Sequence, residues 1–251
     1  MRIVNTHSAH IRCAPLAEKL EKLKARGYIK TMQNSPHKTL EEIEYVLPSE
    51  IERRSFEIIA SELEARKIVL PENEKKVTMR AIHTSADFDY AETLAFSKDA
   101  VQIAKGLIKS GADIITDTNM AKAGISAKTL ARFGGQVHCF MSDEDVAAEA
   151  KKRQVTRASV SMEKAADIGK SGKKLVFAVG NAPTALVTLY EMIQSGEYIP
   201  DFIIGVPVGF VNVVAAKELI LKTNAPHIVN RGRKGGSNIA AAICNAILYD
   251  L

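Results

Sequence analysis

Residues 174–184 read KLVFAVGNAPT, and this stretch decides which fold the chain is expected to adopt. An apolar run over 174–179 leads directly into the turn residues Gly180-Asn181-Ala182-Pro183, and a helix is predicted over 183–195. Short apolar runs bounded by glycine, asparagine or proline are typical of buried strands. The stretch therefore predicts a strand, a tight loop and a helix in immediate succession.

Apolar runs of the same kind lie on both sides of this stretch, with helical patterns between them. Further strands are predicted over 112–116, 136–140, 202–206 and 227–230, and further helices over 126–133, 143–152, 156–171, 213–222 and 237–249. Parallel strands need a long return connection, so this alternation predicts βαβ crossovers and a parallel sheet. Because the runs are apolar throughout, both faces of the sheet should be buried under helices.

The predicted fold class is therefore α/β, a flavodoxin-like doubly wound sheet of five parallel strands in the order 2-1-3-4-5, with helices on both faces. Ahead of the sheet, helical spacing predicts helices from residue 51 onward and over 73–83 and 99–109. Residues 1–38 differ from the rest, with a short, highly charged helical pattern followed by a polar stretch. We expect them to be an N-terminal extension, either a dimer contact or disordered, before a single domain over 39–251.

The composition bounds what this domain can bind. The chain has 251 residues, of which 46% are apolar, and this is ample for one large buried core. Lys and Arg number 34 against 29 Asp and Glu, which gives a formal net charge of +5. The excess is small and no Lys/Arg tract carries interleaved aromatic residues, so nucleic-acid binding is not expected. A local concentration of this positive charge would suit an acidic ligand.

The cysteines and the N-terminus indicate the compartment. Cys13, Cys139 and Cys244 are far apart, odd in number and without the spacing of a zinc site, so reduced thiols in the cytoplasm are expected. The first residues contain no apolar signal region, and no stretch reaches the roughly 18–20 apolar residues of a membrane span. We therefore expect a soluble, cytoplasmic protein with no membrane partner.

Ligands of open parallel sheets bind outside the carboxyl ends of the strands, and the loops predicted there contain many turn residues. The last of them, RGRKGGS over 231–237, combines three glycines with the cations Arg231, Arg233 and Lys234. Glycines allow close backbone approach, helix N-termini attract anions, and arginine can hold a carboxylate through two hydrogen bonds. This loop is expected to bind an anion; the alternative is a solvated, charged turn. Neither GxxxxGK[ST] nor GxGxxG occurs, so no nucleotide motif is present.

His83, near the end of a predicted helix, is the candidate for proton transfer. Histidine can accept and donate protons near neutral pH, and neighbouring arginines or carboxylates tune it. From the residues alone, a helix cap or a core histidine is the favoured alternative. Ser55 and Arg157 are also ambiguous, because each falls in a predicted helix without a distinguishing neighbour.

Several segments together resemble the precorrin-8X methylmutase (precorrin isomerase) family of cobalamin biosynthesis. They run in the family's order over about four fifths of the chain and comprise 51–59, 80–83, 180–186, 205–211 and 231–237. The resemblance implies a flavodoxin-like fold, in agreement with the strand pattern. The segment after His83, TSADFDY over 84–90, looks more like the cobalt-using branch of the family.

The resemblance also implies an activity and a set of site residues. The enzyme would move a methyl group from C11 to C12 of precorrin-8 or cobalt-precorrin-8, giving hydrogenobyrinate or cobyrinate. No redox cofactor and no protein-bound metal would be needed for this isomerisation. His83 would be catalytic, and a homodimer with its active site near the subunit interface is expected. The residues expected to bind the polycarboxylate tetrapyrrole are Ser55, Arg157, Asn181, Arg231, Arg233 and Lys234.

Two other functions remain open at this point. A non-catalytic corrinoid-binding or carrier protein could hold the same macrocycle in the same basic site. A phosphosugar- or nucleotide-dependent enzyme of the doubly wound type is the second alternative, although the chain lacks a phosphate-loop signature.

Overall fold

The computed structural model describes residue 44 and residues 46–251 of the chain. The chain divides into two compact units, Met1–Ile51 and Glu52–Leu251. In the first unit, the described residues include a single turn of 3₁₀ helix, η2 (Pro48–Glu50). The extension predicted over 1–38 lies outside the described residues, so its role stays a prediction.

The described residues of the second unit form a sheet of six strands in the order β1-β6-β5-β4-β2-β3. Five of them are the predicted parallel strands, and their order confirms the predicted 2-1-3-4-5. These strands are β2 (Asp113–Thr116), β3 (Val137–His138), β4 (Leu175–Val179), β5 (Phe202–Gly205) and β6 (His227–Asn230).

The predicted strand count of five was wrong by one, because β1 (Leu94–Phe96) adds an antiparallel edge strand beside β6. This strand has three residues, all half-buried, which is too short to show the alternation by which a strand is recognised in sequence. Its pairing, Leu94 with Asn230 and Phe96 with Ile228, depends on backbone hydrogen bonds to β6. An exposed edge of β6 is thereby covered.

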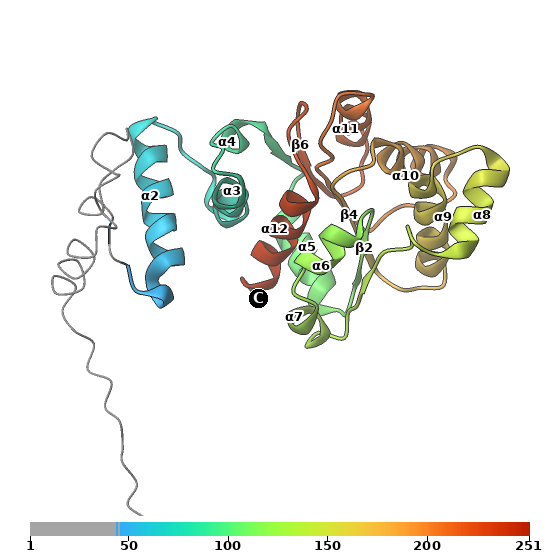
Figure 1. Ribbon diagram of the computed structural model, residues 1–251, viewed down its shortest axis with the longest axis horizontal. Helices are drawn as coiled ribbons and strands as arrows, with labels where there is room; N and C mark the ends of the chain where they lie inside the picture. The colour runs from blue at the N-terminus through green and yellow to red at the C-terminus, as the bar shows by residue number, and fades with distance from the viewer. Residues whose placement is uncertain (1–43, 45) are drawn as a thin grey trace, which may run out of the picture. The chain divides into compact units, whose positions relative to one another are not determined.

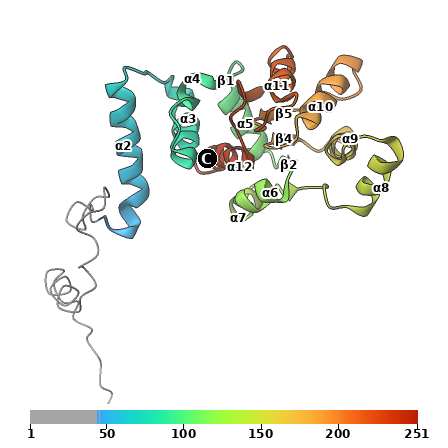
Figure 2. The same cartoon turned by 45° about the horizontal axis from the view of Figure 1, so that its top comes forward.

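The core lies on both faces of the sheet, as the uniformly apolar strands predicted. In β4, Leu175, Phe177 and Val179 belong to one buried cluster, while Val176 and Ala178 belong to the other. One face is covered by α9 (Arg157–Lys170), α10 (Pro183–Ser195) and α11 (Val213–Leu221). On the other face, α5 (Ala100–Lys109) and α12 (Ser237–Leu248) pack against the strands, and α3 (Glu72–Ser85) packs against α12. Ile59 and Leu63 of α2 (Ile51–Ala65) belong to the same buried cluster. Figures 1 and 2 show these two groups of helices on opposite sides of the strands.

Local sequence explains where the helices beside the loops begin. Pro183 takes the first position of α10, where its missing N–H leaves no bond unmade. Thr156 caps α9, since its side chain accepts the N–H of Ser159 at 3.2 Å. The helix α12, with the sequence SNIAAAICNAIL, is apolar around most of its circumference, and such helices are buried.

The predicted helices all occur, with ends that differ by no more than two residues from the prediction. Two of the predicted helices are α7 (Ala127–Ala131) and α8 (Glu144–Arg153). The sequence patterns missed two short helices, α4 (Tyr90–Thr93) and α6 (Asn119–Gly124). Within the described part of the chain, the helices are too short or too polar to traverse a bilayer.

Replacing Phe177 by alanine should destabilise the fold strongly. Phe177 is fully buried in β4, and its ring packs edge-on against Tyr198 at 6.1 Å between centroids. The free energy of unfolding in urea, followed by circular dichroism, should fall by about 3–5 kcal/mol. Val69→Ala is the control, because Val69 is 91% exposed and its loss should change stability by less than about 0.5 kcal/mol. Equal losses in the two variants would contradict the described core.

Candidate active site

Asp117 joins the loops that leave β2 and β4 at the carboxyl edge of the sheet. Its carboxylate is fully buried and accepts the backbone N–H groups of Gly180, Asn181 and Ala182 at 2.9, 2.7 and 2.6 Å. Burial raises the pKa of the Asp117 carboxyl, although the three N–H donors act in the opposite direction. One side chain thus holds the whole turn after β4, the turn from which the fold was predicted.

The start of α12 packs against the same turn. A Cβ atom on Gly180 would lie 2.7 Å from Cα of Ser237, so only glycine allows this approach. The hydroxyls of Thr118 and Ser237 are 2.8 Å apart and link the loop after β2 to α12. Three strand ends therefore meet around one small region.

The loops after β5 and β6 are also joined to each other. Gly236 donates its N–H to the carbonyl of Val206 at 2.9 Å, and Gly209 donates to the carbonyl of Arg233 at 3.1 Å. A Cβ atom on Gly235 would lie 2.1 Å from the oxygen of Val206, so this position requires glycine. The glycines of the RGRKGGS loop hold it against its neighbour.

The cations of that loop are not equivalent. Arg231 contacts both carboxylate oxygens of Glu218 at 2.9 Å, and Lys234 contacts Asp87 and Asp89 at 2.5 Å each. The hydrogen bond from Lys234 lowers the pKa of the Asp87 carboxyl. Arg233 lies 5.4 Å from the centroid of the Phe210 ring and, among the described residues, pairs with no carboxylate. Of the three predicted cations, Arg233 thus keeps its charge available to a ligand.

Lys234 also ties the basic loop to the segment that follows His83. Asp87 and Asp89 come directly after α3, and the N–H of Arg231 reaches the carbonyl of Thr93 at 2.8 Å. The end of α3 that carries His83 is thereby placed at the carboxyl edge of the sheet.

His83 and Ser55 line one pocket of about 500 Å³ on the surface of α2 and α3. The imidazole of His83 is half-buried and stacks on Phe56, with 5.2 Å between ring centroids and 23° between ring planes. The structure therefore brings together the two residues that the sequence named on separate helices. The other lining residues are Ile58, Ile59, Glu62, Arg66, Ile82, Ala86 and Phe88.

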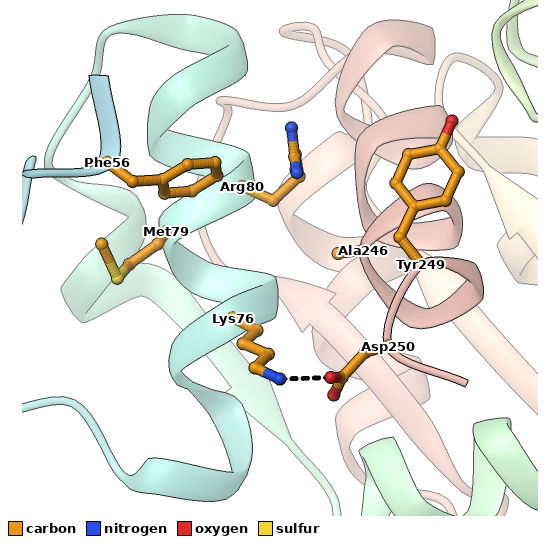
Figure 3. Close-up of a pocket in the computed structure, with 7 residues that line it drawn as sticks. All are labelled: Phe56, Lys76, Met79, Arg80, Ala246, Tyr249 and Asp250. Atoms are coloured by element: carbon orange, nitrogen blue, oxygen red, sulfur yellow. Dashed lines mark hydrogen bonds and ion pairs between the residues drawn. The ribbon is translucent and has the colours of Figure 1, made fainter. Parts of the chain in front are cut away.

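Phe56 also borders a neighbouring pocket of about 310 Å³ (Figure 3). Figure 3 shows the Arg80 guanidinium between the Phe56 and Tyr249 rings, and its central carbon lies 4.8 Å from the centroid of Phe56. Arg80 also pairs with Glu52 at 2.5 Å. Phe56 of α2 thus contacts both Arg80 and His83 of α3. These contacts could not be predicted from the sequence, because a phenylalanine at helical spacing is most often a core residue.

Arg157 and Asn181, both exposed, lie at the starts of two adjacent helices at this edge. Arg157 is the first residue of α9, and the hydroxyls of Thr156 and Thr184 are 2.8 Å apart, which joins α9 to α10. Within the described chain, no hydrogen bond, ion pair or ring contact joins Arg157 or Asn181 to the residues of the His83 pocket. Among the residues that the structure describes, no three His, Cys, Asp or Glu side chains lie close enough together to hold a metal ion.

Comparison with known proteins tests the family resemblance separately from the geometry of the site. Residues 50–250 match the model of the family described as precorrin-8X methylmutase. The chain belongs to this family. It is 40% identical over 202 residues to the cobalt-precorrin-8 methylmutase of Priestia megaterium, covering 80% of this chain and 88% of that protein. It is 34% identical over 208 residues to the precorrin-8X methylmutase of Pseudomonas aeruginosa, covering 82% and 97%.

A solved structure agrees with these matches. The precorrin-8X methylmutase of Thermus thermophilus superposes with a TM-score of 0.71 at 35% identity, covering 80% of this chain and 96% of that one. The family and the α/β fold predicted from the sequence are thus confirmed, and the chain is an isomerase of the methylmutase type. For this methylmutase, the roles of the individual site residues stay predictions.

Asp117→Asn should weaken the carboxyl edge of the methylmutase. One acceptor oxygen becomes an NH₂ group that faces backbone donors, so buried N–H groups lose their partner. The free energy of unfolding should fall by about 1–3 kcal/mol. Asp167→Asn on the exposed surface of α9 is the control and should change stability by less than about 0.5 kcal/mol. Equal stability of Asp117→Asn and the parent protein would show that the turn holds itself without this carboxylate.

Proposed function

We propose that this methylmutase moves a methyl group from C11 to C12 of precorrin-8 or cobalt-precorrin-8. The observation that supports this most directly is the shared pocket of His83 and Ser55, in a chain of this family. His83 stacks on Phe56, and Lys234 links the basic loop to the segment after α3, which supports a role for His83 as a proton donor near a basic loop. A polycarboxylate macrocycle needs both features.

His83 is the proposed proton donor and acceptor. A 1,5-shift of a methyl group across a conjugated ring is symmetry-allowed, but it is slow unless the ring is electron-poor. Protonation of a ring nitrogen by His83 withdraws electron density, and the proton returns to His83 after the methyl group has moved. The reaction is a net isomerisation, because the methyl group stays on the same macrocycle and His83 recovers its proton. General acid help of this kind contributes about 10²–10⁴-fold, and the remainder comes from holding the macrocycle in a reactive shape.

The acetate and propionate arms of the substrate are the proposed partners of the polar residues at this edge. Arg233 would bind an arm directly, since its guanidinium can form two parallel hydrogen bonds to a carboxylate. Ser55, Arg157, Asn181, Arg231 and Lys234 remain in the proposed binding set. Arg231 and Lys234 would first have to exchange or share the carboxylates that they already contact.

The cobalt form is the favoured substrate. Identity is higher to the Priestia protein, named for cobalt-precorrin-8, than to the Pseudomonas protein, named for precorrin-8X, at 40% against 34%. The segment over 84–90 supports the same choice. Cobalt held in the macrocycle would be part of the substrate and would need no ligand from the protein.

We also propose a cytoplasmic homodimer with the active site near the subunit interface. Phe210 and Val211, 82% and 76% exposed, form an apolar tip beside Arg233 that a second subunit would cover. Cys139 and Cys244 are free thiols, as expected in a reducing compartment.

His83→Ala should lose turnover while it keeps binding. Because the methyl shift changes the conjugated path, turnover of cobalt-precorrin-8 can be followed by visible absorption. We expect kcat to fall by about 10²–10⁴-fold while the affinity for the product changes little. Thr84→Ala, the exposed neighbour, should retain full activity. Equal turnover by His83→Ala and the parent protein would remove His83 from the mechanism, and equal band shifts without turnover in both would indicate a binding protein.

Arg233→Met should weaken substrate binding more than Arg231→Met. Both variants lose one cation, but only Arg233 lacks a carboxylate partner among the residues described. We expect KM to rise by about 10- to 100-fold for Arg233→Met and by less than about fivefold for Arg231→Met. The reverse order would mean that Arg231 leaves Glu218 to bind the substrate.

A further inference from the structure

Lys217 is a buried cation that the proposed mechanism does not use. It lies in α11 with no exposed surface, and its ammonium group donates to the carbonyls of Gly232 and Lys234 at 2.9 and 2.8 Å. No carboxylate of the described residues pairs with it. Burial lowers the pKa of Lys217 to about 8, so the side chain is still mainly charged at neutral pH. A buried charge without a counterion is costly, which calls for an explanation of what it does.

The two carbonyls bound by Lys217 fix the direction of two N–H groups. A trans peptide unit is planar, with its C=O and N–H bonds pointing in opposite directions. The carbonyls of Gly232 and Lys234 point to Lys217, so the N–H groups of Arg233 and Gly235 point away from α11. The ammonium polarises both peptide units and makes these N–H groups stronger donors.

These two N–H groups have no acceptor in the part of the chain that the structure describes. Other donors of the same loop are used by the scaffold, since Arg231 reaches Thr93 and Gly236 reaches Val206. The loop is held from below by a second group as well, because the Asn230 side-chain amide donates to the carbonyl of Lys234 at 2.8 Å. The N–H groups of Arg233 and Gly235 are thus left over from a loop whose other contacts are satisfied.

The charges nearby point to the same kind of ligand. Arg231 and Lys234 are paired with carboxylates of the chain, whereas Arg233 and Lys217 pair with none among the described residues, so these two cations keep positive charge next to the loop that carries the N–H groups. Two directed donors and an unpaired arginine match one carboxylate group. The geometry points to Lys217 as a positioning residue, which holds the 231–236 loop so that the N–H groups of Arg233 and Gly235 bind one carboxylate arm of the substrate. This inference rests on the proposed polycarboxylate substrate.

Lys217→Met tests the inference, because methionine fills nearly the same volume without the charge. Lys222→Met is the matched control, since Lys222 is an exposed lysine at the end of the same helix. In the absorption assay we expect KM to rise by about 10- to 100-fold for Lys217→Met while kcat stays within about threefold, with no change for Lys222→Met. Equal KM values for the two variants, with both proteins folded, would overturn the inference. If the parent protein itself does not turn over the substrate, that result would instead contradict the proposed function.

A measurement on the unaltered protein covers the case in which Lys217→Met does not fold. The amide ¹⁵N–¹H resonances of Arg233 and Gly235 are recorded while hydrogenobyrinate, the metal-free product, is added. Both amide protons should shift downfield, as expected for N–H groups that gain a carboxylate acceptor, and the fully methylated ester should shift them much less. An active enzyme whose Arg233 and Gly235 amides do not respond to the acid would overturn the inference and leave the proposed function intact.

Discussion

The carboxyl edge of the sheet depends on one buried carboxylate, Asp117, and on the three backbone N–H groups that it accepts. Loops at such an edge must bend sharply between strand and helix, which leaves N–H groups without the partners that regular structure supplies. Buried N–H groups are costly unless bonded. Asp117 meets this requirement for the whole turn after β4, and α12 can then pack directly on Gly180. The turn after β4 and the start of α12 are thereby joined, and the Thr118–Ser237 contact links the loop after β2 to the same helix.

A second principle of the edge is that the chain neutralises most of its own cations. Lys234 forms ion pairs with Asp87 and Asp89, and Arg231 forms an ion pair with Glu218. These pairs are exposed, so they contribute little to stability by themselves. The Lys234 pairs do fix where the loop lies relative to the end of α3. Arg233 is then the cation of this loop that has no carboxylate partner among the described residues. Counting cations in the sequence therefore overstates the charge that a ligand would meet.

The sequence predicted the sheet well because its central strands are apolar on both faces and because glycine or proline closely follows the ends of β4, β5 and β6. It failed at β1, where three residues pair only through their backbone, and at α4 and α6, which are shorter than two turns. Within the site, RGRKGGS could be recognised because its charges and glycines are contiguous. Asp117 and Lys217 could not, since each acts through backbone groups more than ten residues away, which no local pattern records. Family resemblance predicted His83 and Ser55 as site residues, whereas the Phe56 ring that stacks on His83 looks like an ordinary core residue in the sequence.

Stability and recognition conflict at Lys217. An aspartate or glutamate beside its ammonium would reduce the cost of burial, because a paired buried charge is less unfavourable than a single one. Such a partner would also cancel the field that the ammonium exerts on the Gly232 and Lys234 carbonyls, and with it the polarisation of the N–H groups on their far side. Lys217 binds both carbonyls and has no carboxylate partner among the described residues, so on the proposed role its charge would stay uncompensated until an anion binds. The cost is therefore carried by the free protein, and a bound carboxylate would relieve it, which is how a buried charge can contribute to affinity for an anion that it never touches.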